Sequence, residues 1–208
     1  NPTATIDDAS CIYGKTYVPD NAFEVYLEQN GMGDGIYLND SVSTANIITV
    51  TSLNVNGKNI ADLTGIEAFT ALTTLWCFNN QLTSLDVSQN TALTYLDCIY
   101  NQLSSLNVSQ NTALTSLQCY NNPLTSLDVS GATALTQLWC RETQLTSLDV
   151  SQNTALTTLE CSYNLLGSLD LRNGNNTNFT YFHANGNPNL YCIDVDNPVL
   201  APYLFTNV

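Results

Sequence analysis

The chain has 208 residues, of which 18 are acidic and 4 are basic, so its formal net charge is −14. This length fits one domain. The negative charge argues against nucleic acid as a partner, because phosphate binding needs clustered Lys and Arg, and it disfavours an anionic membrane surface. No apolar run reaches the roughly 18 residues that a membrane helix requires, so no membrane insertion is expected.

The N-terminal segment, residues 1–47, is predicted to be a leader followed by a cap. Residues 1–15 show no periodicity and predict extended chain. The segment YVPDNAFEVYLEQNG predicts a helix whose first turn is capped by Asp20 or Asn21. The apolar face of this helix consists of Phe23, Tyr26 and Leu27. We expect that face to cover the open end of the coils that follow, as terminal caps do.

Residues 48–195 are dominated by a repeat with a period of 21 residues. The five segments that align without gaps begin at Leu72, Leu93, Leu114, Leu135 and Leu156. A fixed period in this range is the signature of a solenoid. A first coil from Val50 and a degraded last coil raise the expected number to about seven, and residues 196–208 are then expected to form a C-terminal cap.

Within one copy the pattern is LxxLxCxxNxLxxLDVSxNTA. It resembles the leucine-rich repeat family, whose core is LxxLxLxxN/CxL, and in particular the secreted Bacteroidetes proteins built from 21-residue LTxLxCxxNQLTSLDVSxNTA repeats. The resemblance implies a curved right-handed superhelix with a parallel β-sheet of about seven strands on its concave face and a short helical N-terminal cap. The alternation in LDVS favours extended chain on the convex side, and residues 62–70 favour a 3₁₀ turn in the first coil.

A column of cysteines follows from the repeat: Cys77, Cys98, Cys119, Cys140 and Cys161. We expect these thiols to be buried as small apolar groups. Disulfides and a soft-metal ladder are the alternatives, but stacked Cβ vectors are parallel and no CxxC cluster occurs. Cys11 and Cys192 lie near opposite ends of the stack, so no bond is expected between them.

Three polar columns also follow from the period. The corner after each strand carries Asn80, Asn101, Asn122, Asn164 and Asn187, and these amides are expected to pair backbone groups. Thr143 interrupts this series, so its corner should be held less well. On the convex side lie Asp86, Asn107, Asp128, Asp149, Asp170 and Asp194. They are expected to accept hydrogen bonds from turn N–H groups, with Ca²⁺ binding as the alternative.

A column of threonines, Thr73, Thr94, Thr115, Thr136 and Thr157, raises the weaker alternative of ice binding. Catalysis has little support, because His183 has no nucleophile partner at a motif spacing and no GxSxG or HExxH motif occurs. Asp97 and Glu160 are expected about 14 Å apart, too far for a glycosidase pair. We therefore predict that the protein is not an enzyme and needs no cofactor or metal.

The outward positions of the concave sheet carry the most information about function. They hold both tryptophans and eight of the nineteen aromatic residues, and they vary from coil to coil while the core stays constant. The predicted ligand-binding residues are Trp76, Phe78, Tyr95, Asp97, Tyr100, Gln118, Tyr120, Trp139, Arg141, Glu160, Tyr163, Tyr181 and His183.

These residues predict a secreted or cell-surface recognition or adhesion module, present as a monomer, that binds a protein partner. Aromatic and Arg enrichment is typical of protein hot spots. A glycan ligand is the main alternative, because exposed aromatic rings beside amides and carboxylates also suit sugar rings. A structural spacer is the third possibility.

Overall fold

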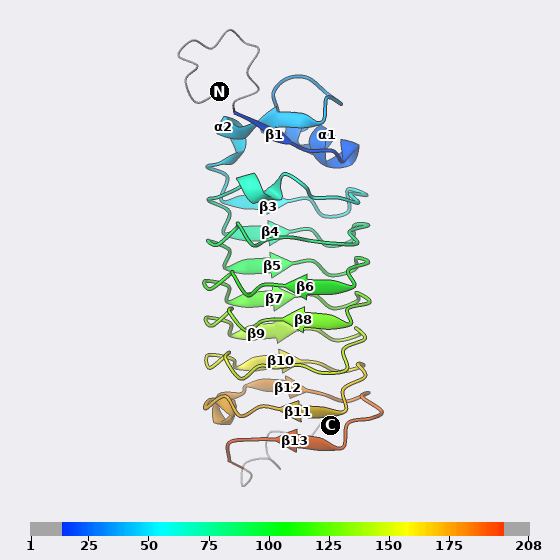
Figure 1. Cartoon of the computed structure of the whole chain (residues 1–208), viewed down its shortest axis with the longest axis vertical. Helices are drawn as coiled ribbons and strands as arrows, with labels where there is room; N and C mark the ends of the chain where they lie inside the picture. Colours follow the sequence, from blue (N-terminus) through cyan, green and yellow to red (C-terminus); the bar gives the residue numbers. More distant parts are fainter. Residues whose placement is uncertain (1–13, 198–208) are drawn as a thin grey trace, which may run out of the picture.

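The computed structural model describes residues 14–197, which form a stack of coils (Figure 1). Each coil contributes one three-residue strand to a seven-stranded parallel sheet along the length of the molecule. In spatial order, the strands are β3 (Ser52–Asn54), β4 (Thr74–Trp76), β5 (Tyr95–Asp97), β7 (Ser116–Gln118), β9 (Gln137–Trp139), β10 (Thr158–Glu160) and β12 (Tyr181–His183). The predicted leucine-rich repeat solenoid of about seven coils is confirmed.

The register of the sheet follows directly from the repeat. Leu96 pairs with Leu117, and Leu117 pairs with Leu138, so equivalent leucines stack from coil to coil. These side chains are fully buried and belong to one continuous core. In the last coil Phe182 replaces the leucine, pairs with Leu159 and is also buried. The inward assignment of the central strand residue is therefore confirmed.

The opposite side of each coil is extended, as predicted. Two short parallel sheets form there, β6 (Ser105–Asn107) with β8 (Ser126–Asp128) and β11 (Ser168–Asp170) with β13 (Cys192–Asp194). Two 3₁₀ turns, η1 (Ile66–Ala68) and η2 (Asn176–Asn178), replace extended chain in the first coil and before the last strand of the main sheet. The 3₁₀ turn predicted for the first coil is therefore confirmed.

The corner asparagines join each coil to the one before it. The Nδ2 group of Asn122 donates to the carbonyl oxygens of Cys98 and Cys119, both at 3.0 Å, and its Oδ1 accepts from the N–H of Leu103 at 3.0 Å. At the interrupted position, the Thr143 hydroxyl reaches one carbonyl of its own coil at 3.2 Å and the next corner amide. The amide bonds to the preceding coil are missing there, so this corner has fewer hydrogen bonds, in line with the prediction.

A second asparagine ladder, which the sequence reasoning missed, lies inside the convex side. It consists of Asn90, Asn111 and Asn153, all fully buried. The Nδ2 group of Asn111 donates to the carbonyl oxygens of Val87 (2.9 Å) and Asn90 (3.0 Å). The signal was present in the constant asparagine of the VSQNT segments, because a polar residue kept inside a buried turn satisfies backbone carbonyls.

The cysteine column is buried, as expected. All five thiols are free and inaccessible to solvent. Burial raises the pKa of each thiol, and it raises the pKa of Cys140 to about 12. Cys192 is free and exposed, whereas Cys11 lies outside the described residues, so the expectation that these two do not pair stays a prediction.

The N-terminal cap precedes the first coil. It comprises β1 (Lys15–Tyr17), α1 (Asn21–Gln29), β2 (Ser41–Ser43) and α2 (Thr44–Ile47), with β1 and β2 paired antiparallel. The helix is where the sequence predicted it, but the strand pair and the second helix were not predicted. Most of the expected leader, residues 1–13, and most of the expected C-terminal cap, residues 198–208, lie outside the described residues.

Asp20 connects this cap to the first coil through hydrogen bonds. One carboxylate oxygen caps the first turn of α1, and the other accepts from the N–H groups of Ala61 (2.8 Å) and Asp62 (3.1 Å) in the first coil. The rings of Phe23 and Phe69 stack across the same junction with their centroids 6.4 Å apart. The predicted role of the helix in covering the first coil is confirmed.

Candidate recognition surface

One surface, here called the sheet face, is formed by the outward residues of the seven-stranded sheet. It also includes two further residues in each coil, those that come directly after the buried Cys, Val or Ala at the end of the strand. Each strand buries its central residue, so the residues on either side point away from the core. The five inner strands are paired with parallel neighbours on both sides, and the edge strands β3 and β12 on one side. The backbone under this surface is therefore fixed before any ligand arrives.

The first of three side-chain clusters on the sheet face surrounds Tyr95. The rings of Trp76 and Tyr95 are tilted against one another with centroids 5.8 Å apart. Gln118 donates a 2.8 Å hydrogen bond from Nε2 to the Tyr95 hydroxyl. The three half-buried side chains come from three adjacent strands, so they present a single apolar and amide surface.

The second cluster is centred on Arg141. Its guanidinium carbon lies 5.2 Å from the centre of the Tyr120 ring, a cation–π arrangement. Tyr100 meets the Tyr120 ring edge-on at 6.0 Å, and Glu142 lies 3.5 Å from the Arg141 guanidinium. Among the outward positions of the seven strands, Arg141 is the only Lys or Arg. The cluster thus carries one cation that is held but still partly exposed.

An open groove of about 500 Å³ adjoins this second cluster. It runs along the corner after the strands, and its wall includes Tyr100, Gln102, Pro123, Glu142 and Gln144. The backbone of Tyr100 and of Glu142 is left-handed, with φ of 51° and 50°. The positive φ turns the chain at these corners, so the Tyr100 and Glu142 side chains lie at the wall of the groove beside the sheet face.

The third cluster lies at the C-terminal end. The rings of Trp139 and Tyr181 are 5.1 Å apart, and those of Tyr181 and His183 are 4.4 Å apart. Tyr181 donates a 2.8 Å hydrogen bond to Glu160, whose carboxylate also lies 3.3 Å from His183 Nδ1. Ser162 donates its N–H to Glu160 at 3.2 Å. This carboxylate therefore organises the rings around it.

Two of the predicted ligand-binding residues are not displayed as expected. Asp97 and Glu160 lie at outward positions of their strands but are only 6% and 4% exposed. Each is flanked in register by larger side chains, Asp97 by Trp76 and Gln118, and Glu160 by Trp139 and a histidine. Burial raises the pKa of Asp97. Both carboxylates support the surface from beneath and do not face a ligand.

Phe78 and Tyr163 stand apart from the three clusters. Phe78 is half-buried, and its N–H donates to Asn56 at 3.0 Å. Tyr163 is exposed at a corner where φ is 53°, and its ring lies against Gly186 so closely that a Cβ there would come within 2.6 Å. Apart from Asp97, which lies in register between Trp76 and Gln118, the other predicted site residues fall into the three clusters described above.

The alternatives on the other columns lose support. Asp86 and Asp128 accept from serine N–H groups two residues later, at 2.9 and 3.0 Å, as expected for turn carboxylates. Residues 14–197 contain no group of three or more His, Cys, Asp or Glu that could hold a metal ion. The hydroxyl of Thr115 donates to the Thr94 carbonyl at 2.9 Å, and the same bond recurs along the column. Those protons are engaged within the chain, which counts against ice binding.

The sequence reasoning also missed an exposed apolar group in the cap. Ile36, Tyr37 and Leu38 follow one another and all reach solvent. The signal was three consecutive large apolar residues within a glycine-rich turn. Among the described residues, no helix has the length and apolar character needed to span a membrane.

No family model matches the chain. Among curated proteins, internalin J of Listeria monocytogenes serotype 4b (strain F2365) is 50% identical over 51 residues, which are 24% of this chain and 6% of that protein. This chain thus corresponds to a small part of the length of that relative.

Two solved internalin structures, both from Listeria monocytogenes strain 4b F2365, share the fold. Internalin C2 superposes with a TM-score of 0.68 at 20% identity, over 94% of this chain and 96% of that chain. Internalin F superposes with a TM-score of 0.62 at 20% identity, over 86% of this chain and 56% of that chain. None of these similarities indicates a catalytic family. The chain is therefore a leucine-rich repeat solenoid with the fold seen in internalins C2 and F, and part of its sequence is similar to internalin J.

Proposed function

We propose that this chain is a non-catalytic recognition module that binds a protein partner through the sheet face. The observation that carries the proposal is the set of three aromatic clusters, one of them around Arg141, on a surface whose backbone is fixed by seven paired strands. Leucine-rich repeat homologues, among them the internalins, are in general protein-interaction modules. Solenoids use their extended sheet surfaces in this way.

The clusters have the composition and preorganisation of a binding hot spot. Trp, Tyr and Arg are enriched among the residues that contribute most to protein interfaces, and Trp and Tyr bury a large area at a low entropic cost. The Trp139 ring is already packed against Tyr181, and Arg141 is already placed over Tyr120. A partner therefore orders few side chains when it binds, and more of the interaction energy appears as affinity.

Charge further defines the partner. Arg141 is partly exposed beside Glu142, so an acidic group on the partner can replace or join that carboxylate. The rest of the chain is strongly acidic, with a net charge of −14. A partner with a basic surface around one carboxylate fits both features, and its association is expected to slow as ionic strength rises.

A glycan is the second candidate, and the first cluster favours it. The Trp76 and Tyr95 rings offer apolar faces, while the Gln118 amide and the Tyr95 hydroxyl lie beside them. This combination can stack on the apolar face of a sugar ring and hydrogen-bond its hydroxyl edge. The groove beside the second cluster, whose wall includes several amides, offers further hydrogen-bonding groups to a longer glycan.

The finer features of the proposal stay predictions. They are secretion or display on a bacterial surface, a role in adhesion, the monomeric state, the lack of nucleic-acid or membrane partners, and the kinship with secreted Bacteroidetes repeat proteins. The acidic charge and the absence of lysine-rich patches support secretion or surface display, and they support the lack of nucleic-acid or membrane partners.

Parallel arrays test the proposal. The purified chain is applied to a panel of extracellular proteins and to a glycan array, with the Trp139→Ala variant beside it and Asp128→Ala on the convex side as the matched control. Saturable protein binding that Trp139→Ala loses and Asp128→Ala keeps is the expected result. Binding confined to glycans would establish the second candidate instead, and no saturable binding to either would contradict both.

A further inference from the structure

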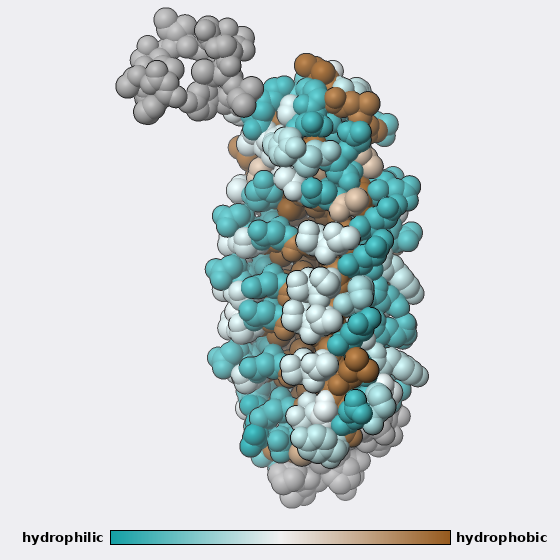
Figure 2. Space-filling model, turned by 45° about the vertical axis from the view of Figure 1, so that its right-hand side comes forward, coloured by the Kyte–Doolittle hydropathy of each residue, from teal (hydrophilic) through white to brown (hydrophobic). Residues whose placement is uncertain are grey.

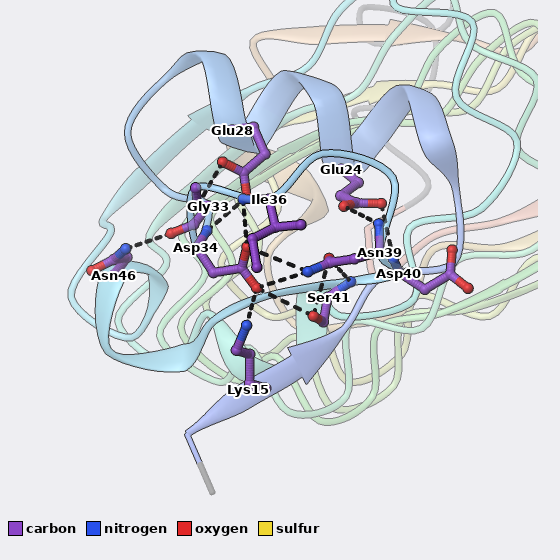
Figure 3. Close-up of polar contacts among 11 residues, drawn as sticks. Lys15, Glu24, Glu28, Gly33, Asp34, Ile36, Asn39, Asp40, Ser41 and Asn46 are labelled. Atoms are coloured by element: carbon purple, nitrogen blue, oxygen red, sulfur yellow. Dashed lines mark hydrogen bonds and ion pairs between the residues drawn. The ribbon is translucent and has the colours of Figure 1, made fainter. Parts of the chain in front are cut away.

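The cap contains a loop, residues 33–40, whose shape is fixed by carboxylates; it is here called the cap loop (Figure 3). Asp34 accepts hydrogen bonds from the Ile36 N–H (2.9 Å), Asn39 Nδ2 (3.2 Å) and Ser41 Oγ (3.3 Å), and it pairs with Lys15. The Asp34 side chain is only 5% exposed. The Asp34 carboxylate thus connects the middle of the cap loop, the end of the cap loop and strand β1.

Two glutamates of α1 hold the rest of the cap loop. Glu28 accepts from the N–H groups of Asp34 (2.6 Å) and Gly35 (3.0 Å). Glu24, which is fully buried, accepts from the N–H groups of Asn39 (2.9 Å) and Asp40 (3.1 Å). The two glutamates are four residues apart and therefore lie on one face of the helix. The loop is tied to α1 at both its beginning and its end.

This rigid loop presents apolar side chains to solvent. Ile36, Tyr37 and Leu38 are 57%, 52% and 59% exposed, and Tyr17 is exposed on the neighbouring strand β1. Figure 2 shows hydrophobic colour at the cap end, whereas along the coils on that side hydrophobic colour lies mainly in furrows between polar columns. Consecutive large apolar residues held outward in a well-bonded loop are typical of an interaction site.

Leu38 adds backbone strain to this exposure. Its φ is 60°, in the left-handed region where a bulky residue is an outlier and Gly or Asn is favoured. Its side chain forms no part of the buried core. The sequence therefore keeps a leucine at a position where it is unfavourable both for the backbone and for hydration. Strain of this kind clusters at functional sites.

We infer that the cap loop is a second protein-docking surface, in which Ile36, Tyr37 and Leu38 insert into an apolar pocket of a partner protein rimmed by Lys or Arg. The basic rim follows from charge. In residues 14–48 one lysine stands against five carboxylates, and that lysine is already paired with Asp34. A basic partner is attracted to such a surface, and an acidic one is repelled.

A second copy of this chain does not fit as the occupant. Contact between two caps would bring two acidic surfaces together on chains that each carry −14. The four basic residues are also engaged within the chain: Lys15 with Asp34, Lys58 over Tyr26, Arg141 over Tyr120 and Arg172 with Asp170. They offer no basic-rimmed pocket to a neighbour. The docking surface is separate from the sheet face, so this inference does not depend on the function proposed for the sheet face.

The probe for this surface is a library of random peptides displayed on phage. The library is selected on the chain and counter-selected on the triple variant Ile36→Ser, Tyr37→Ser, Leu38→Ser. We expect enriched peptides to combine apolar residues with Lys or Arg. A synthetic copy should bind the triple variant at least about tenfold more weakly, and its affinity for the parent should fall as salt is raised. The Leu165→Ser variant, which changes an exposed leucine on a coil, should bind like the parent.

A further variant separates binding from folding. Leu38→Gly should raise the Tm by about 2–4 °C, because glycine adopts a positive φ without strain, and it should weaken peptide binding. No enrichment, an acidic or uncharged consensus, or equal binding to the parent and the triple variant would overturn the inference. So would a Tm lowered by Leu38→Gly, which would make the leucine structural, or self-association that only the triple variant loses.

Discussion

The interrupted asparagine ladder allows stability to be increased by one substitution, Thr143→Asn. In the intact corners the amide donates to a carbonyl of its own coil and to one of the preceding coil, and its oxygen accepts a backbone N–H. Asn122 shows all three contacts at 3.0 Å. Thr143 reaches its own coil and the next corner amide only. An asparagine there should restore two buried hydrogen bonds, to the Cys119 carbonyl and from the Leu124 N–H.

The expected gain follows from those two bonds. A buried hydrogen bond contributes about 0.5–1.5 kcal/mol net. Two restored bonds, less the contact of the lost hydroxyl, should raise the free energy of unfolding by about 1–2 kcal/mol. For a chain of this length, each kcal/mol corresponds to a rise in Tm of roughly 2–4 °C.

Thermal unfolding followed by circular dichroism or calorimetry measures this change. The reverse substitution in the neighbouring corner, Asn122→Thr, is the matched control and should lower the Tm. A Thr143→Asn variant whose Tm is unchanged or lower would refute the idea that the amide contacts stabilise the corners.

Three further predictions concern the core, the thiols and the cap. Leu138→Ala, in the centre of the sheet and fully buried, should lower the free energy of unfolding by roughly 2–5 kcal/mol through the cavity left behind; a denaturant midpoint like the parent's would contradict its inward assignment. The five ladder cysteines should resist a thiol reagent in the folded chain and react under denaturing, non-reducing conditions, because burial raises their pKa; mass spectrometry that found a pair linked would exclude free thiols. Burial alone would raise the pKa of Asp34, but hydrogen bonds from Lys15 and Asn39 outweigh it and lower that pKa from 3.8 to about 2. The stability that the Asp34 carboxylate gives is therefore full above about pH 4 and lost as the pH falls towards 2; Asp34→Asn should flatten this part of the pH–stability curve, and an unchanged slope would contradict the assignment.

The repeat made the fold predictable because its period carries three-dimensional information. When every coil has the same length, residues 21 positions apart must stack, so Leu117 lies beside Leu96 and Leu138. The same argument placed the cysteine column in the core and the corner asparagines on backbone groups. Each of these predictions depends only on the position within a coil, and the structure confirmed them.

The position within a coil did not predict the burial of Asp97 and Glu160. Alternation along a strand correctly predicts which side of the sheet each side chain faces. It does not predict whether larger side chains on adjacent strands cover that side chain. Trp76 lies in register beside Asp97, and Trp139 beside Glu160. Whether a carboxylate is exposed on a parallel sheet depends on these cross-strand neighbours, which vary from coil to coil.

From the sequence, the cap loop was placed within the N-terminal cap, but none of its contacts was predicted. Its conformation depends on contacts between residues far apart in the sequence, such as Glu24 with the N–H of Asn39 and Lys15 with Asp34. No periodicity relates these positions, so no pattern predicts the contacts. The exposed leucine with positive φ became visible only with the backbone itself.

The central claim, that the sheet face carries the binding site, is tested most directly by comparing two variants. The affinity of Trp139→Ala and of Asp128→Ala for a partner captured by the parent chain is measured by calorimetry, with the Tm of each variant determined alongside. Trp139→Ala should weaken binding by about 2 kcal/mol or more, roughly thirtyfold, while Asp128→Ala on the convex side should bind like the parent. Equal losses in both variants, or a loss in Asp128→Ala alone, would place the site away from the sheet face and contradict the account.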